Sequence, residues 1–394
     1  MFGYSIDELK KLGTYWTAVE IFQQPATWNK TIAQIKAEFN QIKAFINQVI
    51  TNDDFDIIFS GAGTSEFVGN ALFSGLNKYY NYKVKSYAST ELVVAPELYI
   101  SKDKPTLLIS FGRSGNSPES VGAIEAANAV GKNVYHLFIT CNHEGQLSKF
   151  AVGNARCYAL NLTPETHDQS FAMTSSFSNM YLAALLCLRL DDIDNIVADF
   201  NSIINATERF LNDDYLLLIN KIKEFNFNRI IYLGSNVLKG IAQEAALKMC
   251  ELSAGKVMIN FDTPLGFRHG PKSMVSDDSL TILMLSDDPF MRRYEMDLLR
   301  EMSRERKNNQ LMVITSGYQI ADLDLENLTN LVINFNINSE HNNLLLGICY
   351  IVVAQLFAMM KSIDLNVMPD TPCPSGEVNR VVKGVTIYPY GGNE

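Results

Sequence analysis

Three ionisable residues whose spacing suits proton transfer lie in one helical segment of this 394-residue chain. Glu244, Lys248 and Glu251 belong to residues 240–252, GIAQEAALKMCEL, and helical geometry puts positions i, i+4 and i+7 on one face. In a pocket, a carboxylate beside a lysine is a general base suited to moving a proton next to a carbonyl group. The same spacing is also typical of a solvated row of surface salt bridges. Spacing alone leaves both interpretations open.

A histidine follows closely, in residues 261–271, FDTPLGFRHGP. An isolated histidine is usually packed or caps a helix. His269 instead falls in a segment framed by glycine and proline, where loops present side chains rather than bury them. It is therefore a candidate acid–base group.

Two loops rich in glycine and hydroxyl groups could bind an anion. Residues 110–119 read SFGRSGNSPE, and residues 61–65 read GAGTS. Glycines let backbone N–H groups turn inward, arginine adds positive charge, and proline suits the first turn of a helix. An ordinary turn with a serine cap is the alternative for the first loop. The expected phosphate ligands are Thr64, Ser65, Arg113, Ser114 and Ser117.

Other ligand classes are disfavoured. The chain has no GxGxxG or GxxxxGK[ST] motif, so dinucleotides and nucleoside triphosphates fit poorly. A formal net charge of -10 argues against general nucleic-acid binding. The histidines form no ligand spacing, so we expect no metal. The six cysteines form no CxxC pair, so we expect reduced, buried thiols in a cytoplasmic protein. No organic cofactor is expected.

Short apolar runs that alternate with helical stretches predict parallel α/β layers. The first half has such runs at 57–59, 107–109, 134–139 and 157–160, after an N-terminal segment with apolar residues at helical spacing. Runs at 230–235, 281–285 and 311–316 repeat this order about 174 residues later. Each half closes with an apolar helix, at 177–190 and 344–360.

We therefore predict an α/β fold with two doubly wound parallel-sheet domains, which form an internal repeat. The expected parts are an N-terminal helical segment over 1–50, a first domain over 51–200, a second over 201–368 and a tail over 369–394 that closes the site. The second half's counterpart of the anion loop, residues 286–289 (SDDP), is acidic and should repel phosphate. Only the first copy is expected to bind the anion.

We expect a soluble protein. The N-terminus lacks the uninterrupted apolar region of a signal peptide. The segment 344–360 is short for a bilayer span and carries Gln355, so a buried helix explains it better than a membrane span.

Taken in order, the SGNS loop, the EAALKMCEL helix and the RHGP segment resemble the sugar isomerase (SIS) domain family. The tandem arrangement resembles the isomerase part of glucosamine-6-phosphate synthase. The opening AVEIFQQPATW and the ending VNRVVKGVTIY resemble the AgaS group of tagatose-6-phosphate ketose/aldose isomerases and galactosamine-6-phosphate deaminases. The likeness extends over essentially the whole chain.

The resemblance implies a role for each matching residue. Thr64, Ser65, Ser114 and Ser117 would hold the phosphate, and Glu251 would move a proton between sugar C1 and C2. Lys248 would line the same pocket, and His269 would open the sugar ring from a neighbouring subunit. Lys383 would contact the carbonyl end of the sugar. The synthase differs in having Ser and Gln at positions 112 and 113, where this chain has Gly112 and Arg113.

The synthase's glutamine-hydrolysing domain has no counterpart here, which favours deamination over amino-sugar synthesis. The resemblance thus implies conversion of galactosamine 6-phosphate to tagatose 6-phosphate and ammonia in a homodimer or higher homo-oligomer. Alternatives are a glucosamine-6-phosphate or fructosamine-6-phosphate deaminase and a plain aldose–ketose isomerase. A catalytically silent regulator that senses sugar phosphates is an alternative from another class.

Overall fold

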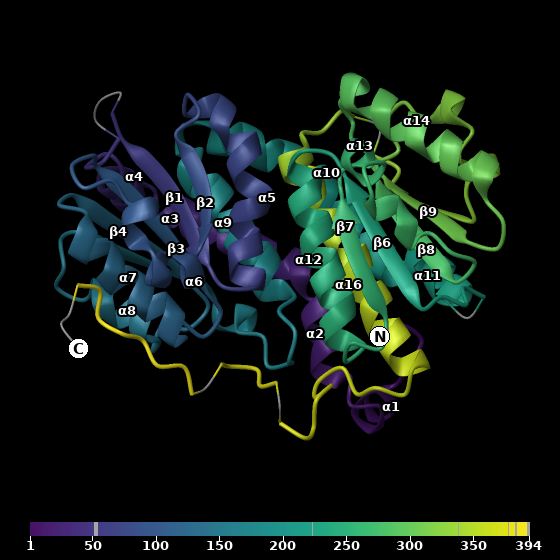
Figure 1. Cartoon of the computed structure of the whole chain (residues 1–394), viewed down its shortest axis with the longest axis horizontal. Coiled ribbons are helices and arrows are strands. Elements are labelled where there is room, and N and C mark those ends of the chain that lie inside the picture. The colour runs from purple at the N-terminus through teal and green to yellow at the C-terminus, as the bar shows by residue number, and fades with distance from the viewer. Residues whose placement is uncertain (51–53, 223, 338, 377, 383, 392–394) are drawn as a thin grey trace. The chain divides into compact units, whose positions relative to one another are not determined.

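The chain forms two compact units in the computed structural model, and each unit combines separate segments of the sequence (Figure 1). The structure describes residues 1–50, 54–222, 224–337, 339–376, 378–382 and 384–391. Unit 1 comprises Met1–Pro25, Gln169–Thr174 and Asn195–Pro374. Unit 2 comprises Ala26–Asp168, Ser175–Asp194 and Ser375–Glu394. The boundaries expected at 51–200 and 201–368 stay a prediction.

A five-stranded parallel sheet forms the centre of unit 2, in the order β2-β1-β3-β4-β5. The apolar runs of the sequence form its central strands because helices cover both faces and bury every residue of β1 and β3. The strands are β1 (Asp56–Gly61), β2 (Val84–Ala88), β3 (Thr106–Gly112), β4 (Val134–Thr140) and β5 (Cys157–Asn161).

Helices α5 and α9 pack on one face of this sheet, and α6 and α7 pack together at the other (Figure 1). The N-terminal helical segment predicted from the 3.6-residue spacing is confirmed by α3 and α4. The helices that belong wholly or mainly to unit 2 are α3 (Gln24–Ala37), α4 (Phe39–Ile46), α5 (Thr64–Leu76), α6 (Ser89–Val94), α7 (Pro118–Val130), α8 (Gln146–Ala151) and α9 (Ser175–Leu188).

Unit 1 contains a second five-stranded parallel sheet, in the order β10-β9-β8-β6-β7. Its strands are β6 (Arg229–Gly234), β7 (Met258–Asp262), β8 (Ser279–Met284), β9 (Gln310–Thr315) and β10 (Leu331–Asn334). Helix α12 packs on β6 and β7 and against α16. The helices are α1 (Ile6–Lys11), α2 (Tyr15–Phe22), α10 (Ile193–Arg209), α11 (Tyr215–Ile222), α12 (Val237–Leu252), α13 (Pro264–Phe267), α14 (Pro289–Glu305), α15 (Leu325–Leu328) and α16 (Asn343–Asp364).

The predicted internal repeat is confirmed by the register of the two sheets. Ile57 of β1 lies opposite Leu107 of β3, and Ile230 of β6 lies opposite Leu280 of β8, each 173 residues further along the chain. Both sheets follow the same strand order when β6 to β10 are matched with β1 to β5. In each copy the connections diverge between the first and third strands, which is the switch point where doubly wound sheets bind ligands.

The two most apolar helices are core elements. Every residue of α9 is buried, and α16, although long and apolar enough to cross a bilayer, has its whole apolar window buried. Inside unit 1, the Gln355 side chain accepts a hydrogen bond of 2.8 Å from the Gln24 side chain. A buried helix rather than a membrane span is therefore the correct interpretation of this segment.

The cysteines are all free thiols, but the expectation that they are buried holds for only three of them. Cys141, Cys187 and Cys349 are buried, whereas Cys157, Cys250 and Cys373 are partly exposed. The partly exposed group lies on the edge strand β5, near the end of α12 and in the C-terminal tail, where apolar neighbours in the sequence do not guarantee burial.

Candidate functional site

The residues singled out from the sequence fall into two clusters, one in each unit. Unit 2 carries the two hydroxyl-rich loops, and unit 1 carries Lys248, Glu251 and His269. Lys383 lies outside the residues that the structure describes. Each cluster is built by the local folding of its own unit.

The hydroxyl-rich loops leave the same edge of the unit 2 sheet. Thr64 and Ser65 form the first turn of α5, directly after β1, and are 4% and 6% exposed. Ser114 and Ser117 follow β3, which pairs with β1 through Ser60 and Ser110. Because β1 and β3 flank the switch point, four hydroxyl groups and two helix starts are gathered where this fold class binds anions.

Ser114 and Ser117 differ in what else they do. The Ser117 hydroxyl caps α7 by accepting a hydrogen bond of 3.2 Å from the backbone N–H of Ser120. The Ser114 hydroxyl accepts a longer bond, 3.3 Å, from the backbone N–H of Asn116. The serine cap is therefore real for Ser117, whereas Ser114 closes only a local turn. The side chain of Asn142 braces the loop by donating to the Ser114 carbonyl at 2.9 Å.

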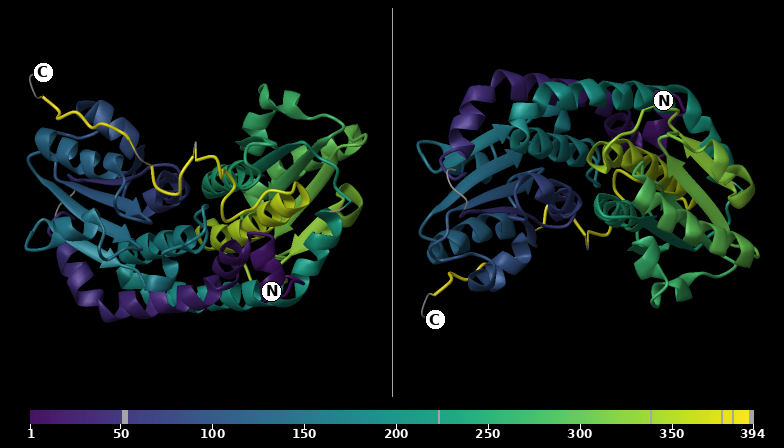
Figure 2. Two further views of the ribbon diagram at one scale, coloured as in Figure 1. Left: turned by 90° about the horizontal axis from the view of Figure 1, so that it is seen from below. Right: turned by 90° about the horizontal axis from the view of Figure 1, so that it is seen from above.

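Arg113 reaches the C-terminal tail. Its side chain is 7% exposed and donates a hydrogen bond of 2.8 Å from Nη2 to the backbone carbonyl of Arg380. The Arg380 guanidinium in turn donates to the backbone carbonyl of Asp168. Farther along, the Ile387 side chain packs on Gly122 of α7, where an added Cβ would meet Ile387 at 2.7 Å. The yellow tail accordingly runs beside the blue helices of unit 2 (Figure 2).

These contacts place the tail beside the hydroxyl-rich loop at 110–119, and they anchor it on both sides of position 383 in the sequence. They also create a basic environment: burial lowers the pKa of His167, and the charges of Arg380 and Arg113 lower it further. Sequence reasoning assigned Arg113 to the phosphate and missed Arg380. The only available signal for Arg380 was its place within the tail motif.

Glu244, Lys248 and Glu251 meet on one face of α12, as the spacing predicts. Lys248 Nζ lies 3.3 Å from Glu244 Oε1 and donates a hydrogen bond to Glu251 Oε2. The side chains of Glu244 and Lys248 are fully buried and that of Glu251 is 25% exposed. A solvated row of surface salt bridges is therefore excluded.

The two carboxylates of this cluster keep Lys248 in its charged form. Burial alone would lower the pKa of Lys248, but the carboxylates of Glu244 and Glu251 raise it above its ordinary value, so this lysine stays a cation. The Lys248 ammonium group therefore pairs with both carboxylates, and of these three side chains only that of Glu251 is partly exposed to solvent. This arrangement holds a carboxylate in one orientation with one face available for a proton.

His269 is exposed on a loop that is anchored at both sides. The short helix α13 begins at Pro264, and the hydroxyl of the preceding Thr263 caps it by accepting a 3.0 Å hydrogen bond from the Gly266 N–H. After it, Arg268 Nη2 lies 2.7 Å from Glu301 of α14, and Lys272 contacts the same carboxylate. The loop backbone is thus fixed to α14 while the imidazole points outward, which agrees with a presented rather than a packed histidine.

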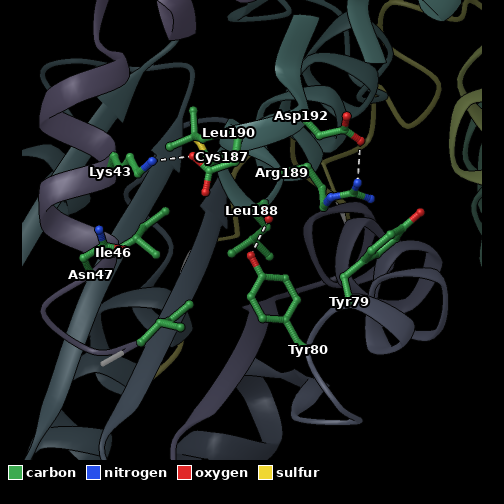
Figure 3. Close-up of a pocket in the computed structure, with 12 residues that line it drawn as sticks. Lys43, Ile46, Asn47, Tyr79, Tyr80, Cys187, Leu188, Arg189, Leu190 and Asp192 are labelled. Carbon is green, nitrogen blue, oxygen red and sulfur yellow. Dashed lines mark hydrogen bonds and ion pairs between the residues drawn. The ribbon is translucent and has the colours of Figure 1, made fainter. Parts of the chain in front are cut away.

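The pocket shown in Figure 3 is not part of either cluster. It has a volume of about 390 Å³ and lies near the ends of α4 and α9, beside Tyr79 and Tyr80, which precede β2. This is the amino-terminal edge of the strands, whereas the hydroxyl-rich loops are at the carboxyl edge. Its charges are mutually paired: Lys43 contacts Asp191, and Arg189 lies 2.5 Å from Asp192 and 3.4 Å from the centre of the Tyr79 ring.

A repeated doubly wound sheet with hydroxyl-rich loops at one switch point defines a protein of the tandem SIS class. The SIS domain family matches residues 50–189. Three comparisons extend this over nearly the whole chain. D-galactosamine-6-phosphate deaminase AgaS of Shewanella sp. (strain ANA-3) is 41% identical over 389 residues, which cover 98% of this chain and 95% of the relative.

Two solved structures share the architecture. A Clostridium novyi NT protein described as a tagatose-6-phosphate ketose/aldose isomerase is 40% identical, has a TM-score of 0.95 and matches with 99% coverage of both chains. The tagatose-6-phosphate ketose/aldose isomerase of Escherichia coli is 34% identical, has a TM-score of 0.87 and matches with 96% and 97% coverage. The chain belongs to the AgaS family of SIS-domain proteins.

Proposed function

We propose that this protein is a cytoplasmic amino-sugar-phosphate deaminase/isomerase that converts galactosamine 6-phosphate and water to tagatose 6-phosphate and ammonia. The observation that carries the proposal is the buried Glu244–Lys248–Glu251 cluster, in which only Glu251 is partly exposed. The names of the relatives support the substrate. A sugar-phosphate sensor would have no need for a carboxylate held ready to move a proton.

The reaction proceeds in three steps. His269 assists ring opening, and the phosphate loops hold the far end of the linear sugar. Glu251 removes the proton from C2 and returns it at C1, so the 2-amino aldehyde becomes an enolamine and then a ketimine at C2. Water adds to the ketimine carbon, ammonia leaves, and the ketone of tagatose 6-phosphate remains. Lys383 acts at the carbonyl end of the sugar.

We further propose that the active unit is at least a homodimer in which His269 serves a neighbouring subunit's site. Its exposed position on an anchored loop supports this role. Symmetric dimers, the commonest oligomers, would place two such loops reciprocally.

The function is tested by measuring ammonia and ketose with four substrates: galactosamine 6-phosphate, glucosamine 6-phosphate and their N-acetyl derivatives. We expect both products in equal amounts from galactosamine 6-phosphate, and little from the other three. Galactose 6-phosphate is assayed beside them. Ketose formation from this sugar, with no ammonia from any amino sugar, would replace deamination by plain aldose–ketose isomerisation.

Ser114→Ala is expected to raise KM about 10–100-fold with little change in kcat. Hydrogen bonds to a charged group contribute about 1.5–3 kcal/mol, and phosphate contacts act equally in the ground state and the transition state. Ser117→Ala should show the same KM effect and also lose about 0.5–2 kcal/mol of stability, because Ser117 caps α7.

Steady-state kinetics and thermal unfolding of both variants check this prediction. Ser5→Ala is the matched control, since Ser5 caps α1 in unit 1 and its loss should lower stability without touching KM. If KM is unchanged in both loop variants, the phosphate is bound elsewhere.

A further inference from the structure

The carboxyl edge of β6 and β8 in unit 1 reproduces the turn at which the phosphate loops begin in unit 2. The residue before α5, Gly63, has φ 56° and ψ −128°, and the residue before α12, Asn236, has φ 54° and ψ −118°. Two residues earlier, both copies have a glycine whose Cβ would approach the following helix to 2.4 Å, Gly61 and Gly234. Asn236 is not a glycine, so this backbone conformation is strained at its position. Unit 1 therefore retains the turn although it costs conformational energy.

The side chain of Glu295, from the second turn of α14, reaches this turn. Glu295 is fully buried, and its Oε2 accepts a hydrogen bond of 2.9 Å from the backbone N–H of Ser286, directly after β8. Ser235, directly after β6, lies near enough to Glu295 to lower its pKa, while Glu295 Oε1 is buried and has no hydrogen-bond partner among the described residues. The carboxylate therefore lies between the loops after β6 and β8, which correspond to the loops after β1 and β3 in unit 2, and its hydrogen bond is to the loop after β8.

Helix polarity suits an anion here. Within the described part of the chain, neither N-cap residue, Gly63 or Asn236, closes its helix with a side-chain hydrogen bond, and the positive end of each helix dipole favours a negative charge. In α12, the N–H groups of Leu238 and Lys239 already donate to backbone carbonyls at 3.0 Å. The acidic residues that follow β8 are directed to other partners. Asp287 lies 3.2 Å from Arg292, and Asp288 caps α14 by accepting from Phe290 at 2.8 Å.

We propose that Glu295 is a resident anion, whose carboxylate occupies in unit 1 the place that a ligand's phosphate takes in unit 2, and that it fixes the start of α12. Helix α12 carries Glu251, so Glu295 is a positioning residue for the catalytic carboxylate. The comparison with a bound phosphate rests on the proposed function, whereas the position of the carboxylate between the two loops does not. The sequence offset alone could not reveal this, because the carboxylate comes from α14 rather than from either loop.

Inorganic phosphate is the probe for the place that Glu295 fills. Glu295→Ala removes the carboxylate and should bind one more equivalent of phosphate per subunit than the wild type in isothermal titration. Glu295→Gln keeps the shape of the side chain and should bind no additional equivalent. Glu305→Ala, from the exposed end of the same helix, is the matched control and should behave as the wild type.

The measured quantity is the difference between variant and wild type, so it stands even if the phosphate loops of unit 2 fail to bind. A wild type without bound phosphate would contradict the proposed function, but an additional equivalent in Glu295→Ala would still support the resident anion. If Glu295→Ala folds and gains no equivalent, the proposal is wrong. If Glu295→Ala folds only when phosphate or formate is added, while Glu305→Ala folds without either, the proposal is supported.

The pH dependence of the stability of Glu295→Gln provides a second test, because an effect of packing alone would not depend on pH. Burial raises the pKa of Glu295 from its ordinary 4.5 to about 7, and the charge of Asp288 adds slightly to this rise. Ser235, the Ser286 N–H and Arg292 lower the pKa, but by less than burial raises it. The folded chain therefore keeps a proton that the unfolded chain has released between these values, and stability falls as the pH rises through this window. The stability difference between wild type and Glu295→Gln should change across it, and a constant difference would contradict a titrating anion at this place.

Discussion

Glu251→Gln is expected to abolish turnover while leaving the binding of the sugar phosphate intact. Glutamine has nearly the same shape and can still accept the hydrogen bond from Lys248, so α12 should be unchanged. It cannot take the C2 proton, and loss of general base catalysis lowers kcat by about 10²–10⁴-fold. Ammonia release and exchange of the C2 proton with deuterated water, followed by NMR, measure the loss.

Glu208→Gln is the control for this variant, because it removes an exposed carboxylate from a helix of the same unit. It should retain wild-type kinetics. Wild-type exchange of the C2 proton in Glu251→Gln would assign the base to another residue, whereas loss of phosphate binding would indicate that the substitution damages the fold.

The same variant also reports on the shared site when it is mixed with His269→Ala. If His269 serves a neighbouring subunit, a mixed dimer has one intact site and one that lacks both groups. Random pairing makes about half of the dimers mixed, so roughly a quarter of wild-type activity should return after joint refolding. Mixed dimers without activity, identified by native mass spectrometry, would place His269 in its own subunit's site.

The buried strands were predictable because strands covered on both faces are apolar throughout. The runs at 57–59, 107–109 and 230–235 became β1, β3 and β6. The strands β2, β7 and β10 were missed, and all three lie at the edge of a sheet. Every residue of β7 is at least partly exposed, and β2 reads VKSYA, so neither carries an apolar run that distinguishes it from a loop.

In the candidate site, too, the sequence predicted local geometry but not burial or tertiary contacts. Helical spacing placed Glu244, Lys248 and Glu251 on one face, but it could not tell a surface row from a buried cluster, because burial depends on what packs over the helix. The contact of Arg113 with the Arg380 carbonyl joins residues that are 267 apart in the sequence. The contact of Glu295 with the Ser286 N–H spans only nine residues, but it depends on how α14 packs back on the loop before it. Pattern reasoning locates such groups only when each has a motif of its own.

Lys248→Met is expected to produce the largest loss of stability of any substitution in the α12 cluster. Removing one partner of a buried ion pair leaves the other charge without compensation and costs about 3–5 kcal/mol. Both Lys248 and its partner Glu244 are fully buried, so water cannot replace the lost cation. Because the pKa of Lys248 is raised above its ordinary 10.5, its contribution is complete at neutral pH and is lost only in alkaline solution, as the pH rises through the raised pKa.

Urea unfolding near pH 7.5, followed by circular dichroism, measures this loss as a fall in the midpoint. Lys239→Met is the matched control on the same helix, since Lys239 is half exposed, lies 3.5 Å from Asp262 and should change stability by less than about 1 kcal/mol. The decisive variant combines Lys248→Met with Glu244→Met. It replaces the pair by apolar side chains and should recover most of the stability, because the cost of the single variant is that of an unpaired buried charge. Activity should not return with it, since Glu251 has then lost the cation that orients it. A double variant no more stable than Lys248→Met would show instead that the lysine acts by filling space, and that Glu244 and Lys248 do not stabilise the fold as a pair.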